Sequence, residues 1–343
     1  MRKMLNTLYI LQPEGYLSLD GNNVVVLVQG KELFRIPGTN IEMILCFSYL
    51  GASPQLMHYC IEQGIHLSFL TPTGKFLASI EGAFRGNVLL RKRQYHVSED
   101  EDFCLRVSKR FIFAKIFNSR FELNKTIRDR KSTKCIDHLT DISYQLREGA
   151  NKTLNALTLS ELRGLEGDTA KIYFSTINDM IISDNESFNF ENRNRRPPTD
   201  RINSLLSFGY SLLAREVTSA ITSVGLDPYV GYLHKDRPGR ESLALDLMEE
   251  LRPIFVDRFV ITLVNLRQLT DEDFIIKETN EVILKEESRK LFIKNWQEKK
   301  RSEIYHPIIR EKIPQGLIPF VQASIFARFL RGELDEYVPY LKR

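Results

Sequence analysis

Cysteine is scarce in this chain of 343 residues, and its spacing excludes two common kinds of site. The four cysteines form no CxxC pair, and they are not spaced with the six histidines as the ligands of a zinc site would be. Their apolar neighbours are typical of buried, reduced thiols, which favours a reducing, intracellular compartment. The four residues are Cys46, Cys60, Cys104 and Cys135.

Long apolar runs are also missing. No stretch reaches the roughly 18 residues that a membrane span needs, and the best candidate, 255–266, is interrupted by Asp257 and Arg258. The N-terminus has no signal-peptide pattern, because Asn6 and Thr7 interrupt its apolar stretch and no small-residue cleavage site follows. We therefore expect a soluble, cytoplasmic protein that does not enter a membrane.

A strong excess of either charge is absent. Lys plus Arg is 48 against 44 for Asp plus Glu, which gives a formal net charge of +4. This balance excludes an acidic, solvating protein and a highly cationic tail, but it does not by itself predict nucleic-acid binding. The informative property is whether the basic residues gather at particular places in the chain.

The hydrophobic pattern divides the chain into two parts with different periods. Up to about residue 90 it predicts strands, including a hairpin over 16–28, and one helix that begins after Ser53 and ends at Gly64. From about Ser98 the period becomes 3.6, as in amphipathic helices. The sequence predicts helices over 103–117, 131–149, 153–183, 199–223, 240–270, 286–300 and 316–332, and a small hairpin over 273–284.

We therefore predict a multidomain α+β protein. A small β-rich domain would occupy residues 1–93, a linker residues 94–98, and a larger all-α catalytic domain residues 99–343. With 43% hydrophobic residues, both domains have enough apolar side chains to bury a core.

A first unusual patch has two glycines, Gly164 and Gly167, on either side of Glu166 within a predicted helix. Glycine destabilises a helix interior by about 1 kcal/mol relative to alanine, so the pair needs a reason. One interpretation is that the backbone comes close to a ligand or another chain and that the carboxylate points towards it. The alternative is a helix boundary, with Glu166 in a first turn favoured by the helix dipole.

A second patch combines His234, in a loop rich in turn residues, with Asp246 and Glu249, which lie three apart on the following helix. An imidazole and hard carboxylate oxygens are suitable ligands for Mg²⁺ or Mn²⁺. Asp246 stands among leucines, where burial without a partner is costly, and this favours a cation or a hydrogen-bonded partner. The alternative is a solvated acidic face with His234 as an ordinary loop residue.

Basic residues gather in two further patches. One precedes a predicted helix and contains the stiff pair Pro197-Pro198, and the other lies near the predicted linker. Arginine clusters of this kind suit the phosphates of a nucleic acid, although solvated loops are the alternative. The predicted DNA-contact residues are Arg193, Arg195, Arg196 and Arg201 in the first patch, Arg85, Arg91 and Arg93 in the second, and Arg240 in the loop after His234.

Arginines close to acidic residues and a histidine are the combination that phosphodiester chemistry needs. The cationic side chains hold the backbone, and the carboxylates hold a metal ion that neutralises charge developing in the transition state. The residues alone therefore predict a metal-dependent nuclease or phosphotransferase that acts on nucleic acid.

At these same patches the sequence resembles a known family, the CRISPR-associated nuclease and integrase of spacer acquisition. The order and the spacing of the segments agree with that family, as does a β-rich part followed by a helical part, so the resemblance covers nearly the whole chain. Residues 5–9 and 86–90 further resemble members from type I-C systems. The segments that carry the family resemblance are 162–167, 197–210 and 231–250.

The resemblance implies a set of site residues. Asp246 matches an acidic position near the metal, and Tyr173 and Tyr232 lie close in sequence to the ligands, where they are candidates for positioning a DNA end. The positions that hold the catalytic divalent metal, Mg²⁺ or Mn²⁺, in the family fall here on Glu166, His234 and Glu249.

The resemblance also implies the reaction and the partners. A DNA 3′-hydroxyl would attack a phosphodiester of the CRISPR array in a transesterification that needs no ATP, and water in its place would give nuclease activity. Two attacks at the two ends of a repeat call for two sites, which relatives obtain from a homodimer formed through the β-rich domain. In relatives a small ferredoxin-like protein bridges two such dimers.

Two other functions are compatible with much of this pattern. A DNA-binding architectural subunit without catalysis would retain the fold, but it would not need the ligand set, which is intact in residue type here. A metal-dependent nuclease outside CRISPR adaptation would keep both the fold and the ligands. A gene located away from any repeat array would favour the second alternative.

Overall fold

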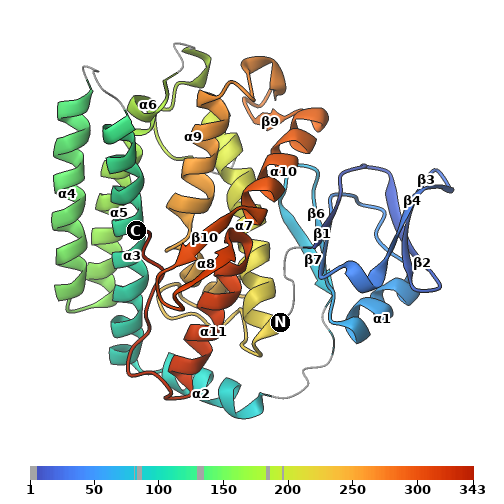
Figure 1. Ribbon diagram of the computed structural model, residues 1–343, viewed down its shortest axis with the longest axis horizontal. Coiled ribbons are helices and arrows are strands. Elements are labelled where there is room, and N and C mark those ends of the chain that lie inside the picture. Colours follow the sequence, from blue (N-terminus) through green and yellow to red (C-terminus); the bar gives the residue numbers. More distant parts are fainter. Residues whose placement is uncertain (1–5, 81, 83–86, 130–134, 183–185, 195–196) are drawn as a thin grey trace. The chain divides into compact units, whose positions relative to one another are not determined.

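The structure of the protein is a computed structural model, shown in Figure 1. It divides into two compact units, and both contain segments from distant parts of the chain. The first unit comprises 1–85, 284–304 and 314–317, and the second comprises 86–283, 305–313 and 318–343. The residues that the structure describes are 6–80, 82, 87–129, 135–182, 186–194 and 197–343.

The first unit is built on two small sheets. Its strands are β1 (Thr7–Ile10), β2 (Gly15–Asp20), β3 (Asn23–Val28), β4 (Lys31–Pro37), β5 (Met43–Cys46), β6 (His66–Leu70) and β7 (Phe76–Ile80). One sheet is antiparallel with the order β2-β3-β4, and it contains the hairpin that the sequence predicted. The other has the order β1-β5-β6-β7, in which β1 and β6 run parallel to β5, and β7 runs antiparallel to β6.

Helix α1 (Pro54–Gln63) begins and ends as predicted. The side chain of Ser53 caps it, because Oγ accepts a hydrogen bond from the main-chain N of Leu56 at 3.2 Å. Gly64 ends it with a φ of 67°, a left-handed conformation that glycine adopts without steric cost. The buried face of α1 belongs to one apolar cluster with both sheets, which includes Leu17, Ile44, Leu56, Cys60 and Leu67.

Helix α10 (Glu286–Arg301) also belongs to the first unit, whereas the sequence predicted it as part of a domain over 99–343. Trp296 on its buried side is fully covered. Near its end, Lys300 Nζ donates a hydrogen bond to Thr7 Oγ1 in the first strand, at 3.4 Å. The predicted domain assignment is wrong for this helix, because α10 forms one compact unit with residues 1–85. Its Lys300 contacts a strand almost 300 residues earlier.

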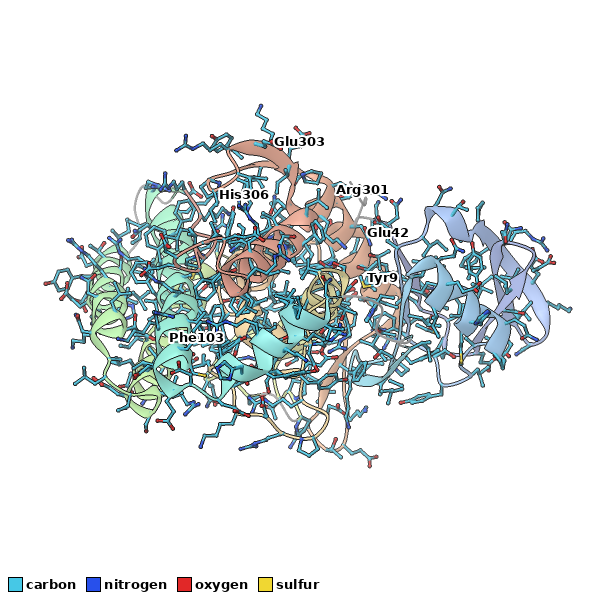
Figure 2. All side chains as sticks on the ribbon, turned by 90° about the horizontal axis from the view of Figure 1, so that it is seen from below. Tyr9, Glu42, Phe103, Arg301, Glu303 and His306 are labelled. Atoms are coloured by element: carbon cyan, nitrogen blue, oxygen red, sulfur yellow. The ribbon has the colours of Figure 1, made fainter. Side chains whose placement is uncertain are left out.

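The second unit is helical, and within it α3, α4 and α5 lie side by side (Figure 1). Its helices are α2 (Val88–Ser98), α3 (Glu101–Asp129), α4 (Ile136–Asn155), α5 (Leu159–Phe174), α6 (Ile177–Met180), α7 (Arg201–Ser223), α8 (Ser242–Met248), α9 (Arg258–Asn265) and α11 (Ile318–Leu330). Phe103, in the first turn of α3 and labelled in Figure 2, belongs to this unit. Its ring stacks on that of Phe329 in α11, with ring centroids 5.4 Å apart. The predicted order of a β-rich part followed by a helical part is thereby confirmed.

The chain also contains two small sheets of two strands each. The pair β8 (Phe274–Ile276) and β9 (Val282–Leu284) forms the hairpin predicted over 273–284. Two further short strands are β10 (Glu303–His306) and β11 (Glu311–Pro314). Among the described residues, no helix combines the length and the apolar character needed to cross a bilayer.

Residues 94–98, predicted as a linker, instead form the last turns of α2. Gln94 is buried, and its amide donates a hydrogen bond to the carbonyl oxygen of Asp227 at 2.7 Å and accepts one from the main-chain N of Asp227 at 2.9 Å. Val97 is buried as well. These hydrogen bonds attach α2 to a loop more than 100 residues later in the chain. A partner so distant leaves no local pattern, and the charged residues of α2 suggested a linker instead of a packed helix.

The long helix predicted over 240–270 is interrupted where the site lies. Helix α8 ends at Met248, and a π-helical turn over Pro253–Asp257 precedes α9. A π-helix has about one residue more per turn than an α-helix, and single π-helical turns are frequently found at functional sites. Here it lies directly after Glu249 and Arg252 and ends at Asp257.

Candidate active site

Helix α5 carries Glu166 in its middle, because the helix runs without a break from Leu159 to Phe174. The alternative of a helix boundary at Glu166 is therefore wrong. A Cβ atom added to Gly164 or to Gly167 would meet no other atom within 4 Å, so neither glycine is required by packing inside the chain. Both glycines are exposed, so the face of α5 on which they lie has room for the close approach of another molecule. Glu166, one and two positions away from them, points from a different face of the helix.

Two carboxylates converge on one ammonium group between α3, α5 and the end of α8. Lys115 of α3 forms ion pairs with Oε1 of Glu166 and with Oε2 of Glu249, the latter at 2.8 Å. Glu249 directly follows α8, and 5% of its side chain is exposed. Its other oxygen, Oε1, pairs with Nε of Arg252 at 3.0 Å.

These neighbours keep the buried groups charged. Burial by itself would raise the pKa of Glu249, but the charges of Arg252 and Lys115 lower it to about 2. Burial would lower the pKa of Lys115, but the carboxylates of Glu249 and Glu166 raise it above its usual value. The cluster is therefore made of opposed full charges at neutral pH.

Asp246 is fully buried and holds the loop that carries His234. Its Oδ2 accepts hydrogen bonds from the main-chain N of Tyr232 at 2.6 Å and of Leu233 at 3.0 Å. Its Oδ1 lies 3.0 Å from the main-chain N of His234 and 2.6 Å from Nδ1 of the same residue. With both oxygens used in this way, Asp246 is a positioning residue, and Nε2 is the ring nitrogen of His234 oriented for a ligand.

Arg163 holds the same loop from the opposite side. Its Nε and Nη2 donate hydrogen bonds to the carbonyl oxygen of Leu233 at 3.1 and 2.6 Å. Arg163 precedes Glu166 by three residues on α5, so one helix positions both the carboxylate and the histidine loop. Sequence analysis assigned Arg163 no role, although this spacing of one helical turn was a usable signal.

Sequence analysis also missed Lys115 and Arg252. Arg252 follows Glu249 by three residues, and that spacing could have identified it as a partner. Lys115 had no comparable local signal, since it stands between Ala114 and Ile116, which are both buried in the core.

The residues fit a divalent ion in their chemistry. Among the described residues, no three His, Cys, Asp or Glu side chains converge closely enough to hold a metal ion as they stand. Glu166 and Glu249 nevertheless enclose a position that already holds a cation, the ammonium of Lys115. Two carboxylates and an imidazole are donors that suit Mg²⁺ or Mn²⁺, and His234 remains the predicted third ligand.

A cavity of about 50 Å³ lies beside this cluster. On its wall the hydroxyl of Tyr210 donates a hydrogen bond to Oδ1 of Asp257, and the Tyr210 ring contacts the guanidinium of Arg252 at 4.8 Å from its centroid. Burial raises the pKa of Asp257 to about 6, although the Tyr210 hydroxyl and nearby cations oppose this shift. The lining residues include Lys115, Glu166, Tyr173, Tyr210, Arg252 and Asp257.

The two predicted DNA-end tyrosines are both buried, each with 3% of its surface exposed. Tyr232 packs in an aromatic core, with ring centroids 5.7 Å from Phe103 and 5.5 Å from Phe326. This burial argues against a direct contact of Tyr232 with DNA. Tyr173 is as deeply buried but lines the cavity beside Glu166, and its predicted role stays a prediction.

The predicted DNA-contact arginines fall into different surroundings. Arg93 is exposed, and Arg91 and Arg240 are half-buried. Three of the predicted residues lie outside the described part of the chain, namely Arg85, Arg195 and Arg196.

Arg193 and Arg201 use part of their hydrogen-bonding capacity inside the chain. Arg193 donates to Oδ1 of Asn203 at 2.6 Å and to Oγ of Ser207 at 3.1 Å, both on α7. Arg201 donates to the carbonyl oxygen of Ser187 at 2.8 Å. Arg193 therefore attaches the basic segment to α7, and Arg201, the first residue of α7, connects this helix to Ser187. The predicted contact of both residues with DNA stays a prediction.

Similarity to known proteins extends over the whole chain. A family model described as CRISPR associated protein Cas1 matches residues 8–298. The CRISPR-associated endonuclease Cas1 1 of Chlorobaculum tepidum is 41% identical over 344 residues, which cover 100% of both chains.

Solved structures of similar fold are known as well. A casposase bound to integration product matches with a TM-score of 0.85 and 24% identity, covering 98% of this chain and 94% of that one. A Cas6-RT-Cas1–Cas2 complex contains a chain that matches with a TM-score of 0.84 and 21% identity, covering 100% of this chain and 37% of that one. At such identities these two structures bear on the fold alone, and they agree with the β-rich and helical parts described above.

Proposed function

The chain belongs to the Cas1 family of CRISPR-associated proteins, and on that premise we propose that it cuts and joins DNA at Glu166, His234 and Glu249 with Mg²⁺ or Mn²⁺. In integration a DNA 3′-hydroxyl attacks a phosphodiester of the CRISPR array, and in cleavage water takes its place. The observation that supports this most is the convergence of two carboxylates, from α5 and from the end of α8, on one cationic position.

Each residue of the site has a separate task in this proposal. A divalent ion bound there polarises the phosphate and stabilises the leaving oxygen. Glu166 and Glu249 supply its oxygen ligands, and His234 supplies a nitrogen. Asp246 keeps a proton on Nδ1 of His234, so that Nε2 carries the lone pair. Arg252 holds the second oxygen of Glu249 and so limits the rotation of that carboxylate.

Double-stranded DNA, as spacer precursor and as repeat, is the proposed substrate. The open surface of α5 at Gly164 and Gly167 leaves room for a duplex backbone to contact the helix that carries Glu166. Arg93 is exposed on α2, and the Arg195 and Arg196 segment adds further positive charge. Phosphate contacts of this kind hold a duplex in place without reading its sequence.

The proposal includes the assembly in which the reaction occurs. A homodimer through the β-rich unit would supply two sites, and a small ferredoxin-like partner would bridge two dimers. The Cas6-RT-Cas1–Cas2 complex supports a protein partner by its composition. Membership of a type I-C system and a cytoplasmic location are part of the same proposal, and the four cysteines, which form no disulfide among the described residues, favour a reducing compartment.

Substitution of the ligands tests this function. Glu166→Gln, Glu249→Gln and His234→Ala should each lower strand transfer into a repeat-containing plasmid by more than about 100-fold. DNA binding, measured by fluorescence anisotropy, should survive. Asp168→Asn is the matched control, because Asp168 is exposed on the same helix as Glu166. Retained strand transfer in all three ligand variants would refute the proposal.

Binding, cleavage and strand-transfer assays of the wild-type protein distinguish the proposed function from the two alternatives. An architectural subunit would bind the repeat and give neither cleavage nor strand transfer with Mg²⁺ or Mn²⁺. A nuclease without a role in adaptation would cleave DNA and give no joined product at the repeat ends. Joined products at both ends of the repeat are the result that we expect.

A further inference from the structure

Lys115 occupies the position on which the two proposed metal-binding carboxylates converge. Its side chain is 16% exposed, and it pairs with both Glu166 and Glu249. The residues three and four positions away along α3 are buried, so Lys115 stands on a buried face of the helix. They are Phe111, Ile112, Asn118 and Ser119. A buried ammonium group is tolerated only when it is paired, and both partners here are groups that the proposed function assigns to a metal ion.

The cluster is neutral without any metal ion. The positive charges of Lys115 and Arg252 balance the negative charges of Glu166 and Glu249. A divalent ion bound by the same two carboxylates would lie within a few ångströms of the ammonium group. Like charges so close repel strongly where little water screens them, so the carboxylates cannot hold both cations between them.

We propose that Lys115 is a positioning residue, which holds Glu166 and Glu249 in place until a divalent ion displaces its ammonium group. This inference rests on the proposed function, because it assigns a further residue to the same site. In the metal-free protein the lysine prevents the two carboxylates from repelling each other. When a metal ion binds, both ion pairs must break, so the lysine also limits the affinity of the site.

The cavity beside the cluster provides a place for the displaced ammonium group. Its wall includes Lys115 itself together with Tyr210 and Asp257. Asp257 is 2% exposed, and its carboxylate accepts a hydrogen bond from the Tyr210 hydroxyl. A lysine side chain has four rotatable carbon bonds, so rotation can carry its charge from the carboxylate pair towards Asp257. The ammonium group would then remain paired in both states.

Binding of Mn²⁺ to the metal-free protein, measured by isothermal titration calorimetry without DNA, tests this role. Lys115→Met removes the charge and keeps most of the length of the side chain. We expect it to bind Mn²⁺ at least about tenfold more tightly than the wild type, because no like charge has to be displaced. Lys125→Met, on the same helix and outside the cluster, is the control and should bind like the wild type. Equal or weaker binding by Lys115→Met would overturn the inference.

Thermal unfolding gives a second measurement that does not depend on activity. In EDTA the Tm of Lys115→Met should be lower than that of the wild type, because Glu166 and Glu249 then repel each other. Saturating Mn²⁺ should raise its Tm by more than it raises the wild-type Tm. Lys115→Gln, which can still donate hydrogen bonds, should behave in the same way if Lys115→Met folds poorly. A lower Tm without a larger Mn²⁺ shift would identify a merely structural lysine.

Glu166→Gln distinguishes a failure of this inference from a failure of the proposed function. If the wild type binds no Mn²⁺, or if Glu166→Gln binds it as tightly as the wild type, the metal site itself is misplaced. If binding depends on Glu166 and Lys115→Met leaves the affinity unchanged, only the role of Lys115 is wrong.

Discussion

Asp246 and His234 are joined twice by the same carboxylate oxygen. Oδ1 of Asp246 lies 2.6 Å from Nδ1 of the imidazole and 3.0 Å from the main-chain N of the same residue. The other oxygen of Asp246 accepts hydrogen bonds from the two preceding main-chain N–H groups. One buried side chain therefore fixes the loop, the position of the ring and its tautomer together.

We expect Asp246→Ala to lower the free energy of unfolding by about 3 kcal/mol or more, because three main-chain N–H groups lose their acceptor at about 1–3 kcal/mol each. Strand transfer should fall with it, since His234 loses its orientation. Asp246→Asn keeps one acceptor oxygen and should lie between the wild type and Asp246→Ala. Urea unfolding and the plasmid assay measure both effects, with Asp168→Asn as the control. Wild-type stability in Asp246→Ala would contradict this account.

The burial of Glu250 predicts that the free energy of unfolding depends on pH. This residue is fully buried and accepts hydrogen bonds from the Tyr337 hydroxyl at 2.7 Å and from the main-chain N of Tyr340 at 3.0 Å. Burial raises its pKa to about 8 from 4.5, although these hydrogen bonds oppose the shift. Between pH 4.5 and about pH 8, Glu250 stays protonated in the folded protein, whereas it releases this proton in the unfolded chain. The contribution of Glu250 to stability is therefore lost as the pH rises through about 8.

Glu250→Gln removes this titration without a change in side-chain length. From about pH 5 to pH 8 the stability of the wild type relative to the variant should decrease, by up to about 1.4 kcal/mol per pH unit. Urea unfolding of both proteins across this range is the measurement. A difference that stays constant with pH would show that Glu250 is ionised throughout.

Asn118 holds the C-terminal segment that follows α11 by hydrogen bonds to Tyr340 and Lys342. Its amide Nδ2 donates hydrogen bonds to the carbonyl oxygens of Glu250 at 2.7 Å and of Tyr340 at 2.9 Å, and its Oδ1 accepts one from the main-chain N of Lys342 at 2.9 Å. Asn118→Ala should therefore lower the free energy of unfolding by about 3 kcal/mol, since the buried Asn118 side chain loses three hydrogen bonds. Asn151→Ala, at an exposed position of α4, is the control and should stay within about 0.5 kcal/mol of the wild type.

The basic segment before α7 gives a prediction about salt dependence. Each phosphate contact contributes about 0.9 to the slope of log affinity against log salt concentration, so loss of Arg195 and Arg196 should reduce that slope by up to about 2. Anisotropy titrations of the double alanine variant with duplex DNA at several salt concentrations measure it. An unchanged slope would mean that these two residues belong to a solvated loop. Arg193→Ala provides a contrast, because its bonds to Asn203 and Ser207 predict a loss of stability.

Local signals in the sequence were sufficient where the structure itself depends on local contacts. Ser53 and Gly64 identified both ends of α1 because helix caps act on residues three or four positions away. Helix α10 belongs to one compact unit with residues 1–85, and no pattern within 286–300 contains that information.

The candidate site, too, could be predicted from the sequence only where its residues form local patterns. Its acidic residues were identifiable because unpaired carboxylates and paired glycines are unusual in helices. Lys115 was not, because its role depends on two carboxylates that are more than 50 and more than 130 residues away in the chain. A lysine with partners so remote has no local pattern to distinguish it from a surface residue.

Gly164 and Gly167 provide a test in which stability and function should change in opposite directions. A Cβ atom at either position meets nothing within 4 Å, so alanine should raise the free energy of unfolding by about 0.5–1 kcal/mol per site. Affinity for DNA and strand transfer should nevertheless fall, because the proposed duplex backbone approaches α5 on the face from which the added methyl groups project.

Gly149→Ala is the matched contrast for these two variants, because its Cβ would lie 2.5 Å from Cγ2 of Thr169 and should destabilise the packing of α4 on α5. Urea unfolding and anisotropy titrations on the same preparations separate the two effects. If Gly164→Ala and Gly167→Ala are more stable and bind DNA as the wild type does, then no ligand approaches this face of α5. In that case Glu166 would have to meet the phosphodiester from another side of the helix.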